Sequence, residues 1–368
     1  MATFAVTYLL AVQKGEGVDK KIEQICLEQS AELPRKVLSK SIIDEVVGRP
    51  RGREQVADGR FKVVIEWPLA NIGKEDIIQF LNLLYGNVSL QPGIQVVDVE
   101  WSALSEFFAG PQFGIEGIRS RYQITGRPMS ATALKPLGSS SQKLADLAQQ
   151  FARGGIDIIK DDHGIMDQKY APFEERLTSC VSTLKEVAQK RGRKTYYFPN
   201  ITAEAWEAEE RYLRAAELGA DGVLICPHIT GLATMHRLAR REEQLPIMAH
   251  PAFSGQLTMN ELQGFAPSFL YGQLWRALGA DFVIYPNTGG RFSYSLAQCK
   301  AINNCSRSSD LPFSPSWPTP AGGISVEKVR HWRNEYGPDT CLLIGGSLYK
   351  YAGGPEEAAK VFSKQLID

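Results

Sequence analysis

The chain has 368 residues, which is enough for one large hydrophobic core and a second, smaller one, so we expect two domains. Its 41 basic side chains balance 41 acidic ones, which argues against a nucleic-acid-binding protein and against a polybasic membrane partner. No stretch approaches the ~20 apolar residues of a membrane span, and the first apolar run has no basic region before it. The six cysteines are scattered without a CxxC pair, as expected of reduced thiols in a cytoplasmic enzyme.

Residues 1–118 alternate short apolar strands with helical patterns, which predicts a small N-terminal α+β domain of the ferredoxin-like kind. The expected strands cover residues 4–12, 61–67 and 94–101, and the expected helices cover residues 19–29 and 74–84. The segment FAGPQFGIEG then ends this domain in a turn-rich stretch.

Residues 119–368 repeat a different pattern, in which an apolar run is followed by an amphipathic helix eight times. The runs are MSATALK, IDIIKDD, TYYFPN, DGVLICP, PIMAH, DFVIYP, PTPAGG and CLLIGG. Continuous apolar strands joined by helices indicate a parallel sheet, and eight units fit a closed (β/α)8 TIM barrel. A doubly wound open sheet is the competing α/β arrangement.

Polar residues gather at the carboxyl ends of these runs, where a barrel carries its chemistry. They are Lys135, Lys160, Asp161, Asp162, His163, Asn200, His228, His250, Tyr285, Asn287 and the glycine pairs 322–323 and 345–346. Because such ends meet on one rim, we expect a shared site there. A solvated turn at residues 160–163 and an exposed structural lysine at 135 are the simpler interpretations of these residues taken singly.

Two chemical roles follow for the lysines. A neutral lysine amine beside carboxylates can be carbamylated by CO2 and then bind Mg²⁺, and Lys160 precedes Asp161 and Asp162. Lys135 would be a general acid or base, or an electrostatic partner for a developing enolate. The pairs in PAGGIS and IGGSL each stand at a strand end before a helix, which predicts a backbone phosphate site.

These residues carry a resemblance to RuBisCO-like proteins, form IV members of the RuBisCO superfamily, over nearly the whole chain. The similar motifs are YGNVSL at 85–90, FAGPQFGIEGIR at 108–119, LKPLG at 134–138, GGIDIIKDD at 154–162, PNIT at 199–202, MAHPAFSG at 248–255, PAGGI at 320–324 and IGGS at 344–347.

The resemblance implies three groups of site residues. Catalytic roles fall to Lys135, Lys160, His250 and Asn87. Substrate or phosphate binding falls to Gly322, Gly323, Gly345, Gly346, Glu28 and Asn200. Metal binding falls to Lys160, Asp162 and His163, with Mg²⁺ or another divalent ion and a CO2-derived carbamate on Lys160. The family completes each site from a neighbouring subunit, so the resemblance also implies a homodimer.

Several positions depart from the carboxylase pattern. His163 stands where the family has a second carboxylate ligand, which weakens a magnesium site. Pro251 replaces an arginine, and Tyr285 and Pro286 replace a histidine, that would hold a second phosphate. The loop NTGGRFSYS has no clear match to the mobile-loop lysine, although Arg291 could partly replace it. Carboxylation of a bisphosphate is therefore not expected.

The resemblance instead implies an enzyme that forms and reprotonates the enolate of a phosphorylated ketose, an isomerase or enolase of methionine salvage. Candidate substrates are 5-methylthioribulose 1-phosphate and 2,3-diketo-5-methylthiopentyl 1-phosphate. The enolase branch has a lysine where this chain has Asn87, which argues against a simple copy of that enzyme. A decarboxylase of a branched oxo-sugar acid phosphate and an inactive phosphoester-binding or regulatory relative are the alternatives.

Overall fold

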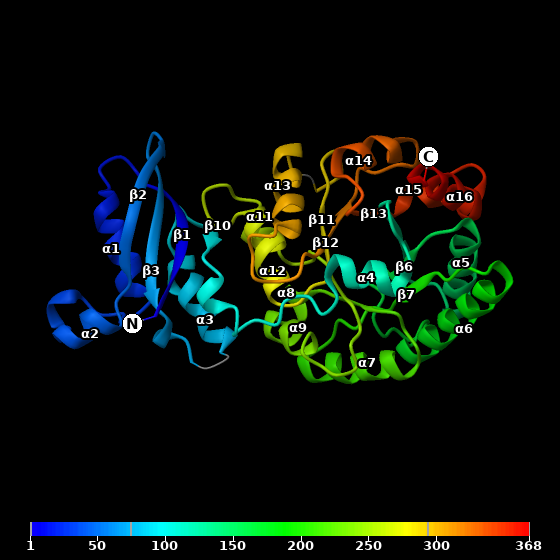
Figure 1. Ribbon diagram of the computed structural model, residues 1–368, viewed down its shortest axis with the longest axis horizontal. Helices are drawn as coiled ribbons and strands as arrows, with labels where there is room; N and C mark the ends of the chain where they lie inside the picture. The colour runs from blue at the N-terminus through cyan, green and yellow to red at the C-terminus, as the bar shows by residue number, and fades with distance from the viewer. Residues whose placement is uncertain (1, 74–75, 293, 368) are drawn as a thin grey trace. The chain divides into compact units, whose positions relative to one another are not determined.

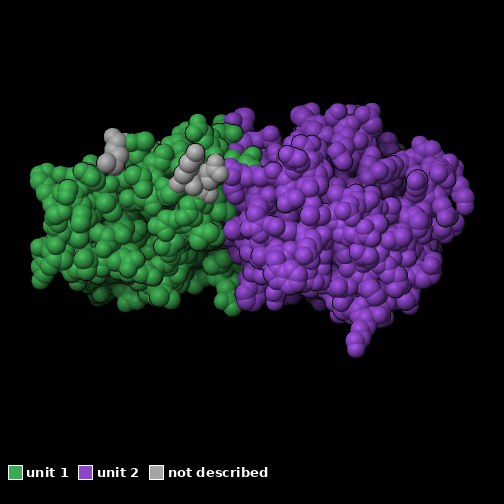
Figure 2. All heavy atoms as spheres, turned by 90° about the horizontal axis from the view of Figure 1, so that it is seen from below, with its two compact units in different colours: residues 1–109, 254–270, 310–312 green, residues 110–253, 271–309, 313–368 purple. Residues whose placement is uncertain are grey.

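The computed structural model describes residues 2–73, 76–292 and 294–367, and the chain forms two compact units (Figure 2). The first comprises residues 1–109, 254–270 and 310–312, and the second comprises residues 110–253, 271–309 and 313–368. The second unit begins before residue 119 because Ile115 and Ile118 of helix α4 belong to the barrel core. No helix in the described part of the chain is long and apolar enough to cross a membrane.

The first unit contains a five-stranded sheet in the order β10-β4-β1-β3-β2. Its elements are β1 (Thr3–Ala11), α1 (Val18–Glu28), α2 (Lys40–Glu45), β2 (Arg49–Ala57), β3 (Arg60–Pro68), α3 (Ile77–Tyr85), β4 (Ile94–Val99), α10 (Gly255–Thr258), β10 (Gly264–Phe265) and α11 (Pro267–Phe269). Strand β1 pairs antiparallel with both β3 and β4, so the predicted α+β domain is confirmed. The expected helix at 74–84 is α3, and residues 74 and 75 lie outside the described residues.

The second unit contains an eight-stranded parallel sheet, and each strand coincides with one of the eight predicted runs. The strands are β5 (Met129–Leu134), β6 (Ile158–Asp161), β7 (Tyr196–Phe198), β8 (Val223–Ile225), β9 (Ile247–Ala249), β11 (Phe282–Pro286), β12 (Trp317–Ala321) and β13 (Cys341–Ile344). The order is β7-β6-β5-β13-β12-β11-β9-β8. The ring closes where Leu224 N–H donates to the Pro199 carbonyl and Ile201 N–H donates to the Leu224 carbonyl. The predicted (β/α)8 barrel is therefore confirmed.

Helices cover the outside of this barrel, and α5 and α6 lie side by side in Figure 1. The helices of the second unit are α4 (Gly114–Tyr122), α5 (Ser141–Gly154), α6 (Phe173–Arg191), α7 (Ala205–Glu217), α8 (Pro227–Thr230), α9 (Leu232–Leu238), α12 (Trp275–Ala277), α13 (Leu296–Arg307), α14 (Val329–Tyr336), α15 (Gly346–Tyr349) and α16 (Gly354–Ile367). Helix α5 shows how the local sequence determines where a helix begins and ends. The Ser140 side chain caps its first turn by accepting from Lys143 N–H, and Gly155, at φ +93°, ends it.

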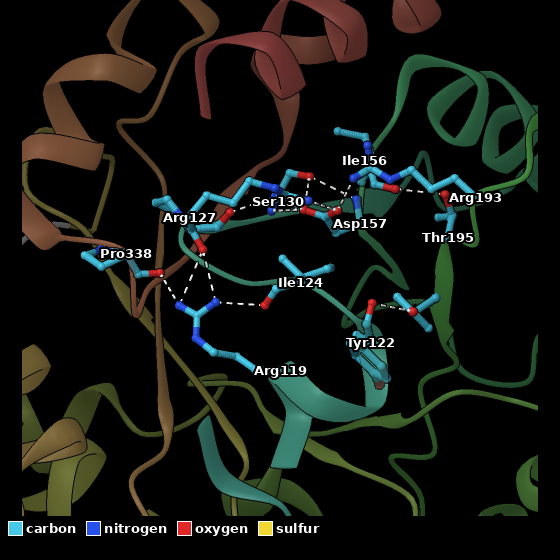
Figure 3. A network of polar contacts seen from close by, with 12 residues as sticks. Arg119, Tyr122, Ile124, Arg127, Ser130, Ile156, Asp157, Arg193, Thr195 and Pro338 are labelled. Carbon is cyan, nitrogen blue, oxygen red and sulfur yellow. Dashed lines mark hydrogen bonds and ion pairs between the residues drawn. The ribbon is translucent and has the colours of Figure 1, made fainter. Parts of the chain in front are cut away.

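The amino-terminal end of the barrel is closed by α4 and by buried ion pairs (Figure 3). The Arg127 guanidinium donates to both carboxylate oxygens of Asp157 at 2.8 Å, and Asp157 also accepts from the N–H and the hydroxyl of Ser130. Arg119 donates to the carbonyls of Ile124 and Pro338. Because this end is packed and paired, the opposite, carboxyl end of the strands is the face open to chemistry.

Candidate active site

A cavity of about 1100 Å³ opens at the carboxyl ends of the barrel strands. Among the described residues, all that line it belong to the second unit. The predicted site residues that line it are Lys135, Lys160, Asp162, His163, His250, Gly322, Gly323, Gly345 and Gly346. Side chains and turns that are far apart in the sequence thus face one space large enough for a sugar phosphate.

Lys135 and Asp162 form an ion pair in this cavity. The Lys135 ammonium donates to Oδ1 of Asp162 at 2.6 Å, and His163 Nδ1 lies 3.6 Å from the same oxygen. Burial by itself would raise the pKa of Asp162, but His163, Lys160 and Lys135 together hold that pKa well below its usual range. Asp162 is therefore a carboxylate at neutral pH, and it keeps the Lys135 cation at the cavity wall.

Lys160 is the second amine of the site, and it lies on β6 with only 2% of its surface exposed. Its ammonium donates to the carbonyl of Asp161 at 3.0 Å. Burial, aided by the charge of Lys135, lowers the pKa of Lys160 to about 8, although Asp162 acts in the opposite direction. The two lysines therefore differ in kind: one is an ion-paired cation, and the other is buried and has a pKa lowered to about 8.

Two imidazoles stack on the same side of the cavity. The rings of His163 and His250 lie 4.4 Å apart at an interplanar angle of 11°. Burial and the nearby Lys160 charge hold the pKa of His250 well below its ordinary value, so this imidazole is neutral. Its Nδ1 accepts from Ala252 N–H at 3.1 Å, which leaves the proton on Nε2.

Asp161 faces away from the cavity, although it is adjacent to Asp162. It is fully buried and accepts from Arg176 Nε at 3.0 Å and from the Tyr197 hydroxyl at 2.7 Å. Alternation of side chains along β6 accounts for this, because Lys160 and Asp161 must point to opposite faces of the sheet. The alternation was the signal in the sequence that could have separated the two aspartates.

Asn200 is fully buried and does not line the cavity. Its amide group donates to the carbonyls of His163 and Ile165 at 2.9 and 3.0 Å, and its backbone N–H donates to Asp161. In this arrangement Asn200 holds the loop that carries His163, and a direct contact between Asn200 and a substrate stays a prediction.

The two glycine turns form one wall of the cavity. Gly322 and Gly323 have φ values of +86° and +68°, which favour glycine. A Cβ at Gly323 would lie 2.6 Å from the Thr288 carbonyl oxygen, so a larger residue does not fit. Gly346 begins α15, and Gly345 directly precedes it. These exposed backbone turns are suited to an anionic group.

Additional residues that the sequence did not single out also line the cavity. Lys328 and Lys350 lie just beyond the two glycine turns, and Ser325 and Ser347 lie within those segments. Their position in the sequence could have identified them, because they follow the two strands that end in the glycine pairs. Apolar lining comes from Pro251, Ile284, Pro286, Phe292 and Ala352. The cavity thus combines a cationic, donor-rich wall with apolar surface.

Glu28 and Asn87 lie in the first unit and do not line the cavity. Asn87 Nδ2 donates to Glu28 Oε1 at 3.0 Å, which joins the end of α1 to the turn that follows α3. The structure therefore places Glu28 and Asn87 in contact with each other. Their participation in an active site stays a prediction.

With Lys160 unmodified, the donor atoms around it do not fit a magnesium ion. Asp162 is the one carboxylate of the KDDH segment that lines the cavity, and its Oδ1 is already bound by Lys135. The other side chains of this segment and of β9 that line the cavity, Lys160, His163 and His250, offer nitrogens, and Glu327 lies on the segment after β12, whereas Mg²⁺ prefers oxygen ligands in octahedral geometry. Within residues 2–73, 76–292 and 294–367, no three His, Cys, Asp or Glu side chains are grouped to hold a metal ion. We therefore assign no step to a metal.

Comparison with known proteins identifies the family. Residues 114–295 match the model of the ribulose bisphosphate carboxylase large chain, catalytic domain. The chain is 37% identical to ribulose bisphosphate carboxylase-like protein 1 of Rhodopseudomonas palustris, over 98% of this chain and 96% of that protein. The chain is a RuBisCO-like protein. A crystal structure of a Rubisco-like protein from R. palustris superposes with a TM-score of 0.89 at 34% identity, covering 100% of this chain and 98% of the other.

Two other relatives of this RuBisCO-like protein have names that specify a reaction. It is 35% identical to 5-methylthioribulose-1-phosphate isomerase of Rhodospirillum rubrum, over 90% of this chain and 87% of the relative. It is 33% identical to 2,3-diketo-5-methylthiopentyl-1-phosphate enolase of Geobacillus thermodenitrificans, over 98% and 91%. Both names specify a 5-methylthio 1-phosphate as the compound on which those relatives act.

Proposed function

We propose that this RuBisCO-like protein is an enzyme that moves a proton on a phosphorylated ketose of methionine salvage, with 5-methylthioribulose 1-phosphate as the leading substrate. The observation that supports this best is the convergence of two unlike amines on one cavity. Lys160 is a buried amine that is easily neutral, and Lys135 is a cation fixed by Asp162. A pair of titratable groups whose environments differ in this way divides acid and base roles between them.

In the proposed reaction the glycine turns and Lys328 or Lys350 bind the phosphate. The neutral Lys160 amine takes a proton from the carbon next to the carbonyl, and the Lys135 ammonium stabilises the enolate oxygen that develops. The Nε2–H of His250 is a further donor for a substrate hydroxyl. Protonation of the former carbonyl carbon, while the hydroxyl proton of the other carbon passes to the enolate oxygen, completes an isomerisation. Return of a solvent-derived proton to the original carbon gives exchange with solvent.

The apolar part of the cavity supports a monophosphate with an apolar end. Pro251 and Pro286 occupy positions where a second phosphate would need cationic or polar partners, and both line the cavity. Burying an unpaired phosphate there would be costly, whereas a methylthio group loses no hydrogen bond. We therefore assign the glycine turns to the phosphate and the proline side to the alkylthio group.

The test is incubation of the purified protein with 5-methylthioribulose 1-phosphate in D2O, followed by NMR. We expect a new ketose phosphate or deuterium at a carbon beside the carbonyl. If neither product formation nor exchange occurs at any carbon, the assignment is wrong. The diketo-methylthiopentyl phosphate, run in parallel, separates an isomerase from an enolase.

We also propose a homodimer in which Glu28 and Asn87 complete the partner's cavity. Exposed apolar side chains at the barrel rim support a covering partner: Leu137 and Phe253 lie in turns and Ile229 lies on α8, with 53%, 77% and 51% of their surfaces exposed. Mixing inactive Lys135→Ala with inactive Asn87→Ala should restore about a quarter of the sites at equal concentrations if subunits exchange at random. No recovery from subunits shown to exchange would contradict a shared site.

A further inference from the structure

The hydroxyl of Tyr349 makes two hydrogen bonds with the backbone around Lys135. It accepts from Lys135 N–H at 2.9 Å and donates to the carbonyl of Ala133 at 2.8 Å. Its ring packs edge-on against Phe151, with the ring centres 5.4 Å apart. Tyr349 does not line the cavity, so it affects the chemistry through Lys135 and not by touching substrate.

Tyr349 also belongs to the segment that forms the second glycine turn. It is the last residue of the four-residue helix α15, which begins at Gly346. Leu348, the residue before it, is fully buried, and Leu348 N–H donates to the Gly345 carbonyl at 3.1 Å. A single helical turn, anchored by a buried side chain, therefore joins the glycines to the tyrosine hydroxyl.

The Lys135 side chain approaches the same turn from the other direction. A Cβ placed on Gly345 would lie 3.8 Å from Lys135 Cε, which is ordinary van der Waals contact. Lys135 is thus held at its backbone by one end of α15, and its side chain passes close to the other end. A shift of α15 on binding an anion would act on both.

We infer that Tyr349 is a positioning residue that couples phosphate binding at Gly345 and Gly346 to the placement of Lys135. This inference rests on the proposed function. Binding energy from a part of the substrate that does not react is then used to orient the group that stabilises the enolate. The phosphate accordingly raises the turnover number and does not act on affinity alone.

The experiment divides the substrate into two pieces. The enzyme is supplied with 5-methylthioribulose, which has no phosphate, with and without inorganic phosphite, and deuterium exchange is followed by NMR. In the wild type, phosphite should raise the exchange rate about tenfold or more. Tyr349→Phe keeps the ring against Phe151 but loses both hydrogen bonds, and it should reduce this activation by about tenfold.

Tyr212→Phe is the matched control. The Tyr212 hydroxyl is buried in the same barrel and accepts from Leu245 N–H at 2.9 Å, but Tyr212 does not line the cavity. The control removes the same kind of bond and should retain the wild-type activation by phosphite. Equal loss of activation in both variants would assign the effect of Tyr349 to stability and overturn the inference.

A comparison within the wild type covers the case in which Tyr349→Phe does not fold. At saturation, kcat for the unphosphorylated ketose should be well below kcat for the phosphorylated one. Equal kcat values with different KM values would show that phosphate contributes affinity alone, and the coupling would be refuted. If the phosphorylated ketose is turned over but phosphite does not activate, this inference fails and the proposed function stands. If the phosphorylated ketose is not turned over, both fail.

Discussion

The ammonium of Lys135 and the carboxylate of Asp162 form a 2.6 Å hydrogen bond across two neighbouring strands of the barrel. Lys135 follows β5, and Asp162 follows β6. The pair is partly exposed, with 37% of the lysine side chain and 18% of the aspartate side chain accessible. It therefore contributes little to stability, and its main effect is to fix a cation at the cavity wall.

Replacing Lys135 should remove the activity and leave the fold intact. We expect Lys135→Ala to lower kcat/KM by about a thousandfold, because the enolate loses its cation. The free energy of unfolding should change by less than about 1 kcal/mol, since the ion pair is partly exposed. Lys169→Ala, at an exposed lysine outside the cavity, is the control. Full activity of Lys135→Ala would refute its role.

The pH dependence should report Lys160. Because burial lowers the pKa of Lys160 to about 8, the amine is mostly charged below pH 8 and neutral above it. A base must be neutral to accept a proton, so kcat/KM should rise about tenfold per pH unit below 8 and level off above 8. Lys160→Ala should abolish the activity, and with it the rise in kcat/KM below pH 8. A flat profile between pH 6 and pH 9 would contradict the assignment of Lys160 as the base.

Removing divalent ions should not affect turnover. Of the two carboxylates that line the cavity, Asp162 is already bound by Lys135 and Glu327 lies on the segment after β12, so we expect dialysis against EDTA to leave kcat within about twofold. His163→Glu would add a carboxylate next to Asp162, and this variant should gain a Mg²⁺-dependent rise in melting temperature that the wild type lacks. Loss of wild-type activity on dialysis, restored by Mg²⁺, would overturn this prediction.

The Gly323 turn should tolerate no side chain. Gly323→Ala would place a Cβ 2.6 Å from the Thr288 carbonyl oxygen and 2.7 Å from the Gly290 nitrogen at a φ of +68°. We expect a loss of about 1–3 kcal/mol in unfolding free energy and a higher KM for the phosphorylated ketose. Gly126→Ala has a similar φ of +71° with no atom nearby, so it separates backbone strain from the clash. An unchanged KM in Gly323→Ala would argue against a phosphate at this turn.

The buried carboxylate at the closed end of the barrel should matter for stability alone. Burial favours the neutral form of Asp157, but Arg127 outweighs this and lowers the pKa of Asp157. Asp157→Ala leaves Arg127 without its partner and should cost about 3–5 kcal/mol of unfolding free energy. The KM and kcat of the folded fraction should be unchanged. Because this pKa is lowered, the stabilisation is present at neutral pH and is lost as the pH falls below about 4.

The sequence by itself determined the barrel, its eight strands and much of the site. Continuous apolar runs separated by amphipathic helices specify a buried parallel sheet, and the carboxyl ends of parallel strands must meet on one face. That geometry is why the sequence alone assigns Lys135, Lys160 and the glycine pairs to one cavity.

Only the tertiary structure decided how neighbouring residues divide their roles. Asp161 binds the buried Arg176, and Asp162 binds Lys135 in the cavity, although the two aspartates are adjacent in the chain. The link from Tyr349 to Lys135 spans more than two hundred residues of sequence. Hydrophobic periodicity is a local signal, whereas a buried hydrogen bond forms wherever packing brings a donor to an acceptor, so such pairings follow from the folded chain as a whole.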